Sequence, residues 1–102
     1  MKGLSIPLNQ KGAEEFDHGV LESENLIYID FPDEEVDRLF DDNVVEDINN
    51  AFDLAIDDYE SRQISKEKIK GVMNMVSENK YPVFYKALTI ANKQGLFLSV
   101  DL

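Results

Sequence analysis

The sequence contains no cysteine and a single histidine, His18, among its 102 residues. Without cysteine the chain can form neither disulfide bonds nor cysteine-ligated zinc sites, so we expect a protein of a reducing cytoplasm. A lone histidine between Asp17 and Gly19 is typical of a surface position rather than of a catalytic one. The five glycines are isolated and form no phosphate-binding loop. These absences argue against an enzyme, and we predict no catalytic residue and no bound cofactor.

Long hydrophobic segments are missing as well, because polar or charged residues interrupt every apolar run. A membrane-spanning helix needs ~20 consecutive apolar residues. No N-terminal stretch has the order of charged, apolar and small residues that marks a signal peptide. Hydrophobic residues still make up 43% of the chain, which is enough for a packed core and too many for a disordered acidic tail. We therefore expect one soluble, cytoplasmic globular domain covering residues 1–102.

Basic residues are scarce in the first part of the chain. Residues 1–60 contain 18 aspartates and glutamates against 3 lysines and arginines, whereas residues 61–102 contain 3 against 7. The formal net charge is −11. An acidic surface of this kind repels nucleic acids and anionic membranes, and it attracts cations or basic proteins.

Three segments carry strand patterns. Residues 3–8 place apolar side chains at every second position, with Pro7 expected at the end of the strand. Residues 26–31 are rich in aromatic and β-branched side chains and are followed by Pro32. Residues 96–102 again alternate and close the chain. These patterns predict a small sheet of about three strands.

Helical patterns occupy much of the remaining sequence. Residues 33–61 fit either one long helix or two helices with a break near Asp42, where Asn43 and Glu46 would form a capping box. A shorter helix is predicted within residues 11–25. Its apolar side chains would be Phe16, Val20 and Leu21.

Two further helices have clear starting signals. Ser65 is the predicted cap of a helix over residues 65–78. Pro82 suits the first position of another helix, which Gly95 would end in a left-handed conformation. The order of all these elements predicts an α+β or α/β fold, with three or four helices covering the sheet in a single pair of layers.

The helix predicted over residues 44–60 carries six acidic residues and no lysine or arginine. Over residues 44–60, at ~100° per residue, the apolar side chains fall within one arc and most carboxylates form a ridge on the other side. Exposed helix faces usually mix charges, because Glu–Lys pairs four residues apart stabilise a helix. Here Asp53 and Asp57 are like-charged neighbours, and Asp58 and Glu60 lie at the unfavourable end of the helix dipole. Repeated loss of local stability indicates a functional surface; the alternative is a face that only keeps the protein soluble.

We predict that this acidic surface binds a cationic partner. The predicted partner-binding residues are Asp41, Asp42, Glu46, Asp53, Leu54, Asp57, Asp58 and Glu60. Leu54 is included because it lies off the apolar stripe and could provide an apolar contact. Tyr59 and Tyr28 are further candidates for an aromatic anchor, provided that they are exposed.

Other chemistries fit the residues less well. A helix–loop–helix calcium site needs glycine at the sixth loop position and glutamate at the twelfth, and a loop starting at Asp57 has Arg62 and Lys68 there. Catalysis by paired carboxylates requires a cleft with two different environments. The lysines of the second half lie on ordinary helix faces of a strongly acidic chain. We therefore predict neither a metal ion nor a nucleic acid as ligand.

A ridge of carboxylates can imitate a phosphate backbone and occupy the cationic cleft of a nuclease. The size, acidity, lack of cysteine and α/β order resemble the immunity proteins that bacteria make against their own secreted nuclease toxins. The segment "ALTIANKQGLFLSVDL" (87–102) is similar to the last helix and strand of barstar-like inhibitors. The resemblance implies a bacterial cytoplasmic inhibitor of one cognate toxin, with a ribonuclease (RNase) as the favoured target. The alternatives are a nucleic-acid mimic that inhibits a DNA-binding defence protein and a non-catalytic regulatory subunit.

Overall fold

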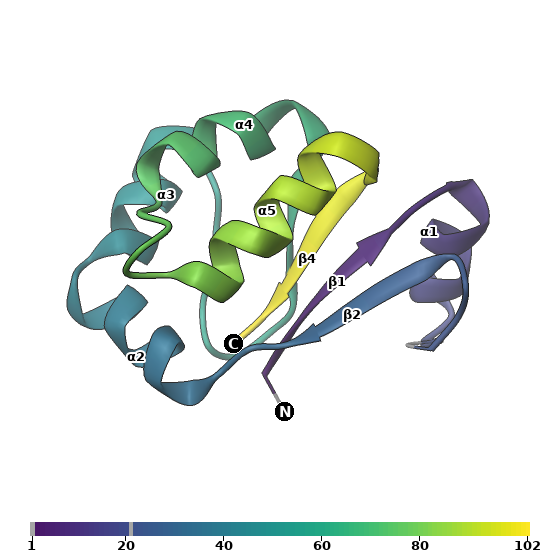
Figure 1. The fold of residues 1–102 in the computed structure, drawn as a ribbon, viewed down its shortest axis with the longest axis horizontal. Helices are drawn as coiled ribbons and strands as arrows, with labels where there is room; N and C mark the ends of the chain where they lie inside the picture. Colours follow the sequence, from purple (N-terminus) through teal and green to yellow (C-terminus); the bar gives the residue numbers. More distant parts are fainter. Residues whose placement is uncertain (1, 21) are drawn as a thin grey trace.

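One antiparallel sheet of four strands organises the fold in this computed structural model, which describes residues 2–20 and 22–102 (Figure 1). The strands are β1 (Gly3–Pro7), β2 (Leu26–Asp30), β3 (Arg62–Ser65) and β4 (Phe97–Asp101), in the order β2-β1-β4-β3. The first and last strands of the chain therefore pair in the centre of the sheet, and the start of β1 lies beside the end of β4 (Figure 1).

The alternation of side chains along the strands gives the sheet two different faces. Leu4 lies in register with both Ile29 and Val100, and Leu98 lies opposite Ile64. The side chains of Leu4, Leu98 and Val100 are at most 1% exposed and form the centre of the core. The intervening residues of the central strands point to the other face and are mostly small or polar.

Helices cover the apolar face of the sheet. Those in the described residues are α1 (Gln10–Asp17), α2 (Asp33–Asp41), α3 (Val44–Phe52), α4 (Lys66–Met75) and α5 (Pro82–Gln94). α4 and α5 contact the sheet directly, and α2 and α3 extend the same layer (Figure 1). α1 lies at the end of the β1–β2 pair, where the ring of Phe16 meets the ring of Phe97 edge-on at a centroid distance of 5.8 Å. The fold is therefore α+β, which is one of the two predicted classes.

Local signals set where two of the helices begin. Pro82 is the first residue of α5, where a missing N–H is harmless. Ser65 directly precedes α4 as predicted, but its side chain forms no capping hydrogen bond. A residue distant in the sequence binds the free N–H groups at the start of α5. The buried carboxylate of Glu35, in α2, accepts hydrogen bonds from the backbone N–H groups of Val83 and Phe84. α2 is thereby tied to the N-terminus of α5.

The structure has one strand and at least one helix more than predicted. β3 was not predicted because its four residues contain a single apolar side chain, Ile64. The break near Asp42 is confirmed, since α2 and α3 are separate helices. The capping box is wrong: Asn43 has a left-handed φ of 61°, and its side chain forms no capping hydrogen bond.

Two further predictions concern Gly95 and the apolar residues of the first predicted helix. Gly95 ends α5, but its φ is −84° and not left-handed. A β-carbon there would lie 2.9 Å from Cγ2 of Ile6, so close packing of the helix end against β1 explains the glycine. The apolar residues predicted for the first helix are placed as follows: Phe16 within α1, Val20 exposed after it, and Leu21 outside the described residues.

Candidate functional site

The predicted acidic helix is shorter in the structure than the apolar pattern of the sequence indicates. α3 stops at Phe52, and Asp53 follows with a left-handed φ of 54°, which aspartate tolerates better than most residues. Residues 54–61 then connect α3 to β3 without forming a helix. The prediction of one continuous carboxylate ridge on a helix over residues 44–60 is therefore wrong. Glu46 stays on α3, and the connection carries Leu54, Asp57, Asp58 and Glu60.

Asn49 holds this connection against α3. Its side-chain amide donates to the carbonyl oxygen of Ile56 and accepts the N–H of Ile56, both at 2.9 Å. The two bonds imitate strand pairing and keep the backbone extended, while the Ile56 side chain enters the core at 5% exposure. The apolar spacing of Ile56 also fits a continuing helix, so periodicity could not distinguish a longer helix from an extended connection.

Replacing Asn49 by alanine should loosen the connection. We expect the free energy of unfolding to fall by about 1–3 kcal/mol, because two backbone groups lose their partner. Amide hydrogen exchange at Ile56 should become faster. The exposed neighbour Asn50 provides the matched control, and Asn50→Ala should change the free energy by no more than about 0.5 kcal/mol. Equal effects of the two substitutions would show that Asn49 does not hold the connection.

Asp57 fastens the far end of the same segment. Its Oδ1 accepts the N–H groups of Tyr59 and Glu60, each at 3.1 Å, and its Oδ2 lies 3.2 Å from Nη2 of Arg62. The hydrogen bond from Glu60, then that from Tyr59, lowers the pKa of the Asp57 carboxyl, and Arg62 lowers it further. The ionised carboxylate supports the loop above the ordinary pKa of aspartate, and this support is lost as the pH falls through the lowered pKa. Asp57 is thus a structural residue of the loop.

A hollow of about 330 Å³ lies between α3 and this segment. The residues that line it include Phe40, Glu46, Asn49, Ile56, Asp57 and Asp58, and we call it the acidic hollow. Glu46 and Asp58 are exposed. Within residues 2–20 and 22–102, neither of these carboxylates forms an ion pair. The fold therefore gathers three predicted site residues, Glu46, Asp57 and Asp58, around one concave surface.

The other predicted residues outside this lining have varied surroundings. Asp41 and Asp53 are exposed at the C-terminal ends of α2 and α3. Glu60 is exposed, with Oε2 3.5 Å from Nη2 of Arg62. Leu54 is half-buried and packs against the core, so it presents less apolar surface than the sequence pattern suggests.

Two aromatic side chains near the acidic hollow are exposed. Tyr59 is 89% exposed and directly follows Asp58, and Phe40 is 36% exposed and lines the hollow. Tyr28, the other predicted aromatic candidate, is half-buried on the sheet. Apolar periodicity assigns Phe40 to the core, so the sequence pattern alone does not identify it as a surface residue.

Asp42 is engaged in the fold. Its carboxylate accepts a hydrogen bond from Oη of Tyr81, which connects the end of α2 to the start of α5. Tyr81 is only 3% exposed. Burial, together with the hydrogen bond to Asp42 and the charge of Asp42, raises the pKa of the Tyr81 phenol to about 12.

The raised pKa of Tyr81 predicts a loss of stability at alkaline pH. An unfolded tyrosine titrates near ~10. A group whose pKa is raised on folding contributes stability that is complete below the unfolded pKa and disappears as the pH rises through the folded pKa of about 12. Urea unfolding across this interval should show a smaller decline for Tyr81→Phe than for the wild type. Tyr59→Phe, at an exposed position, is the control, and parallel declines in all three proteins would contradict the role of Tyr81.

No three His, Asp or Glu side chains in the described part of the chain are grouped so as to hold a metal ion. Between residues 2 and 102, leaving aside residue 21, no helix is both long and apolar enough to cross a bilayer.

The acidic hollow and the exposed aromatic side chains near it are thus the features from which a partner can be inferred. Comparison with protein-family models, with curated proteins and with solved structures finds no match to this chain.

Proposed function

We propose that this protein binds and neutralises a cationic protein toxin, and that the acidic hollow faces the active-site cleft of that toxin. A secreted ribonuclease is the favoured target. The observation that carries the proposal is the exposure of Tyr59, which is 89% exposed between two exposed carboxylates, Asp58 and Glu60. A large aromatic side chain held out among acidic groups matches the anchor of a protein interface with a basic partner.

Carboxylates that form no ion pair within the described part of the chain supply the electrostatic attraction for a basic protein. Glu46 and Asp58 lie at the acidic hollow, and the whole chain has a net charge of −11. A surface of one sign steers an oppositely charged partner during diffusion and raises the association rate. In the cleft of a nuclease, these carboxylates would take the positions of substrate phosphates.

The loop presents Tyr59 in a defined backbone conformation. The N–H groups of Tyr59 and Glu60 are both fixed to Oδ1 of Asp57. A preorganised segment loses less conformational entropy on binding than a flexible one. Asp57 therefore supports the interface by holding the loop, whereas Tyr59 and Asp58 contact the partner.

The proposal is tested by capture and inhibition. The immobilised protein is exposed to an extract of its native cells at low salt, and bound proteins are eluted at high salt and assayed for RNase activity. We expect a small basic nuclease to elute, and its activity to disappear when free wild-type protein is added at stoichiometric amounts. Absence of nuclease activity in the eluate, or a nuclease that the protein does not inhibit, would contradict the proposal.

Truncation of the anchor should weaken the captured complex. Tyr59→Ala should accelerate dissociation ~30-fold, which corresponds to the ~2 kcal/mol typical of an interface hot spot. Tyr59→Phe retains the ring and should stay close to the wild type. Surface-binding kinetics measure both variants, and dissociation of Tyr59→Ala as slow as that of the wild type would exclude Tyr59 as the anchor.

A further inference from the structure

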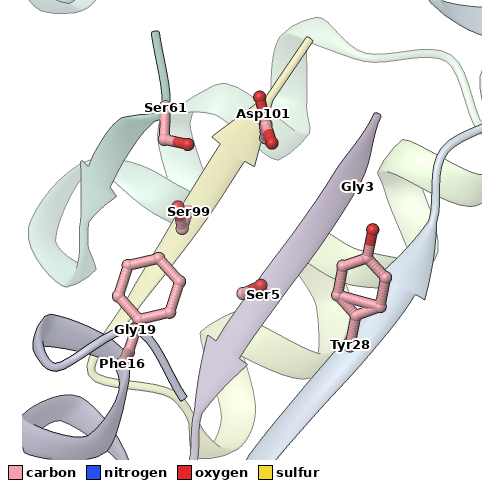
Figure 2. Close-up of a pocket in the computed structure, with 8 residues that line it drawn as sticks. All are labelled: Gly3, Ser5, Phe16, Gly19, Tyr28, Ser61, Ser99 and Asp101. Atoms are coloured by element: carbon pink, nitrogen blue, oxygen red, sulfur yellow. The ribbon is translucent and has the colours of Figure 1, made fainter. Parts of the chain in front are cut away.

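The second face of the sheet, opposite α4 and α5, carries a separate hollow of about 400 Å³ (Figure 2). The lining residues that matter here are Ser5, Phe16, Tyr28, Ser61, Ser99 and Asp101. Figure 2 shows Phe16 on one side and Tyr28 on the other, with Ser5 and Ser99 between them on adjacent strands. We call this the sheet hollow. Its volume falls within the range of small-molecule sites, ~300–1,000 Å³.

The floor of the sheet hollow is polar although it is buried. Ser5 and Ser99 lie directly opposite each other in β1 and β4, and they are 7% and 2% exposed. A serine hydroxyl can both donate a hydrogen bond to a ligand and accept one from it. Two such groups side by side at the base of a hollow therefore suit a polar ligand.

One end of the sheet hollow concentrates negative charge around an aromatic ring. Gly3 lies in register with Asp30 on one side and with Asp101 on the other. The phenol of Tyr28 occupies the space that a side chain at Gly3 would fill. Burial raises the pKa of the Tyr28 phenol, and the carboxylates of Asp30 and Asp101 raise it further. The phenol therefore lies near two carboxylates at this end of the hollow.

The ion pairs of the described residues leave both carboxylates unused. In the part of the chain that the structure describes, the ion pairs involve Lys2 with Asp33 and Arg62 with Asp57 and Glu60. Asp30 and Asp101 take part in none of them. A cationic ligand would therefore meet uncompensated negative charge at this end of the hollow.

We propose that the sheet hollow binds a small molecule that carries a guanidinium group. The planar cation would direct its N–H donors to Asp101 and to the serine hydroxyls, and its face would lie against the ring of Tyr28 or Phe16. Guanidinium combines forked donors with a face that stacks on aromatic rings, which an ammonium group does not offer. This site is distinct from the acidic hollow, and the inference does not rest on the proposed toxin.

The test uses a matched pair of probes on the isotope-labelled full chain. N-acetyl-arginine amide carries the guanidinium, and N-acetyl-citrulline amide has nearly the same shape without the charge. Amide chemical shifts of Ser5, Ser99 and Asp101 should move saturably with the arginine probe and remain unchanged with the citrulline probe. Equal responses to both probes, or shifts confined to residues 41–60, would overturn the proposal.

A single isosteric substitution then locates the charge that is recognised. Asp101 is exposed at the end of β4, so Asp101→Asn should leave the remaining amide spectrum intact. We expect it to raise the Kd of the arginine probe by about threefold to tenfold, because an exposed ion pair is lost together with a charged acceptor. Asp58→Asn, which alters the acidic hollow instead, should leave the Kd unchanged. An unchanged Kd for Asp101→Asn, or an equal rise for Asp58→Asn, would overturn the site.

Discussion

A Glu35→Ala variant is expected to lose about 3 kcal/mol of its free energy of unfolding, because two backbone donors would lose a charged acceptor. Glu35 is only 3% exposed, and its two carboxylate oxygens accept the N–H groups of Val83 at 3.1 Å and Phe84 at 2.7 Å. These donors belong to the first turn of α5, where N–H groups have no partner within the helix. The positive end of the helix dipole adds to the attraction for the carboxylate.

The same helix offers a matched control for this measurement. Asp37 is an exposed carboxylate of α2 with the same charge, and Asp37→Ala should change the free energy of unfolding by no more than about 0.5 kcal/mol. Glu35→Gln should lie between the two, because the amide keeps one acceptor oxygen and loses the charge. Urea denaturation followed by circular dichroism measures all three. If Glu35→Ala costs no more than Asp37→Ala, the link between α2 and α5 is not a stabilising cap.

Reversal of two charges at the acidic hollow should slow capture of the toxin at least about tenfold at low salt, since electrostatic steering contributes 10–10³-fold to association. The variant is Glu46→Lys combined with Asp58→Lys. Both residues are exposed and line the hollow. The difference from the wild type should shrink as salt rises, because exposed charges are screened within ~10 Å at 0.1 M. Asp57 is unsuitable for this experiment because its carboxylate also holds the loop.

The matched control reverses two charges in the basic half of the chain. Lys66→Glu with Lys70→Glu changes two exposed residues of α4 and should alter the association rate less than the acidic pair does. Surface-binding kinetics at several salt concentrations compare both double variants with the wild type. If the lysine pair changes the rate and the acidic pair does not, the acidic surface only keeps the protein soluble.

The acidic segment shows where local patterns were insufficient. Ala55, Ile56 and Tyr59 continue the helical apolar spacing of α3, so periodicity predicts one helix to residue 60. In the structure the helix ends at Phe52, Asn49 binds the backbone of Ile56, and the chain crosses to the sheet as β3. Burial of Ile56 satisfies the apolar pattern in an extended conformation as well as a helix would. Because the helix ends at Phe52, Tyr59 lies on the surface and not on the apolar face of a helix.

The sequence by itself limited the fold to α+β or α/β, and it determined the strands at residues 3–8, 26–31 and 96–102 and the starts of α4 and α5. Alternation, Pro82 and Ser65 act within a few residues, so their effects can be read locally. Only the tertiary structure determined where the two hollows form and which residues line them. The sheet hollow joins groups that are distant along the chain, because strand register sets Ser5 opposite Ser99 and places Asp30 and Asp101 on either side of Gly3. The acidic hollow depends on the path that the chain takes after α3. Register and loop paths follow from packing of the whole core, and no short stretch of sequence contains that information.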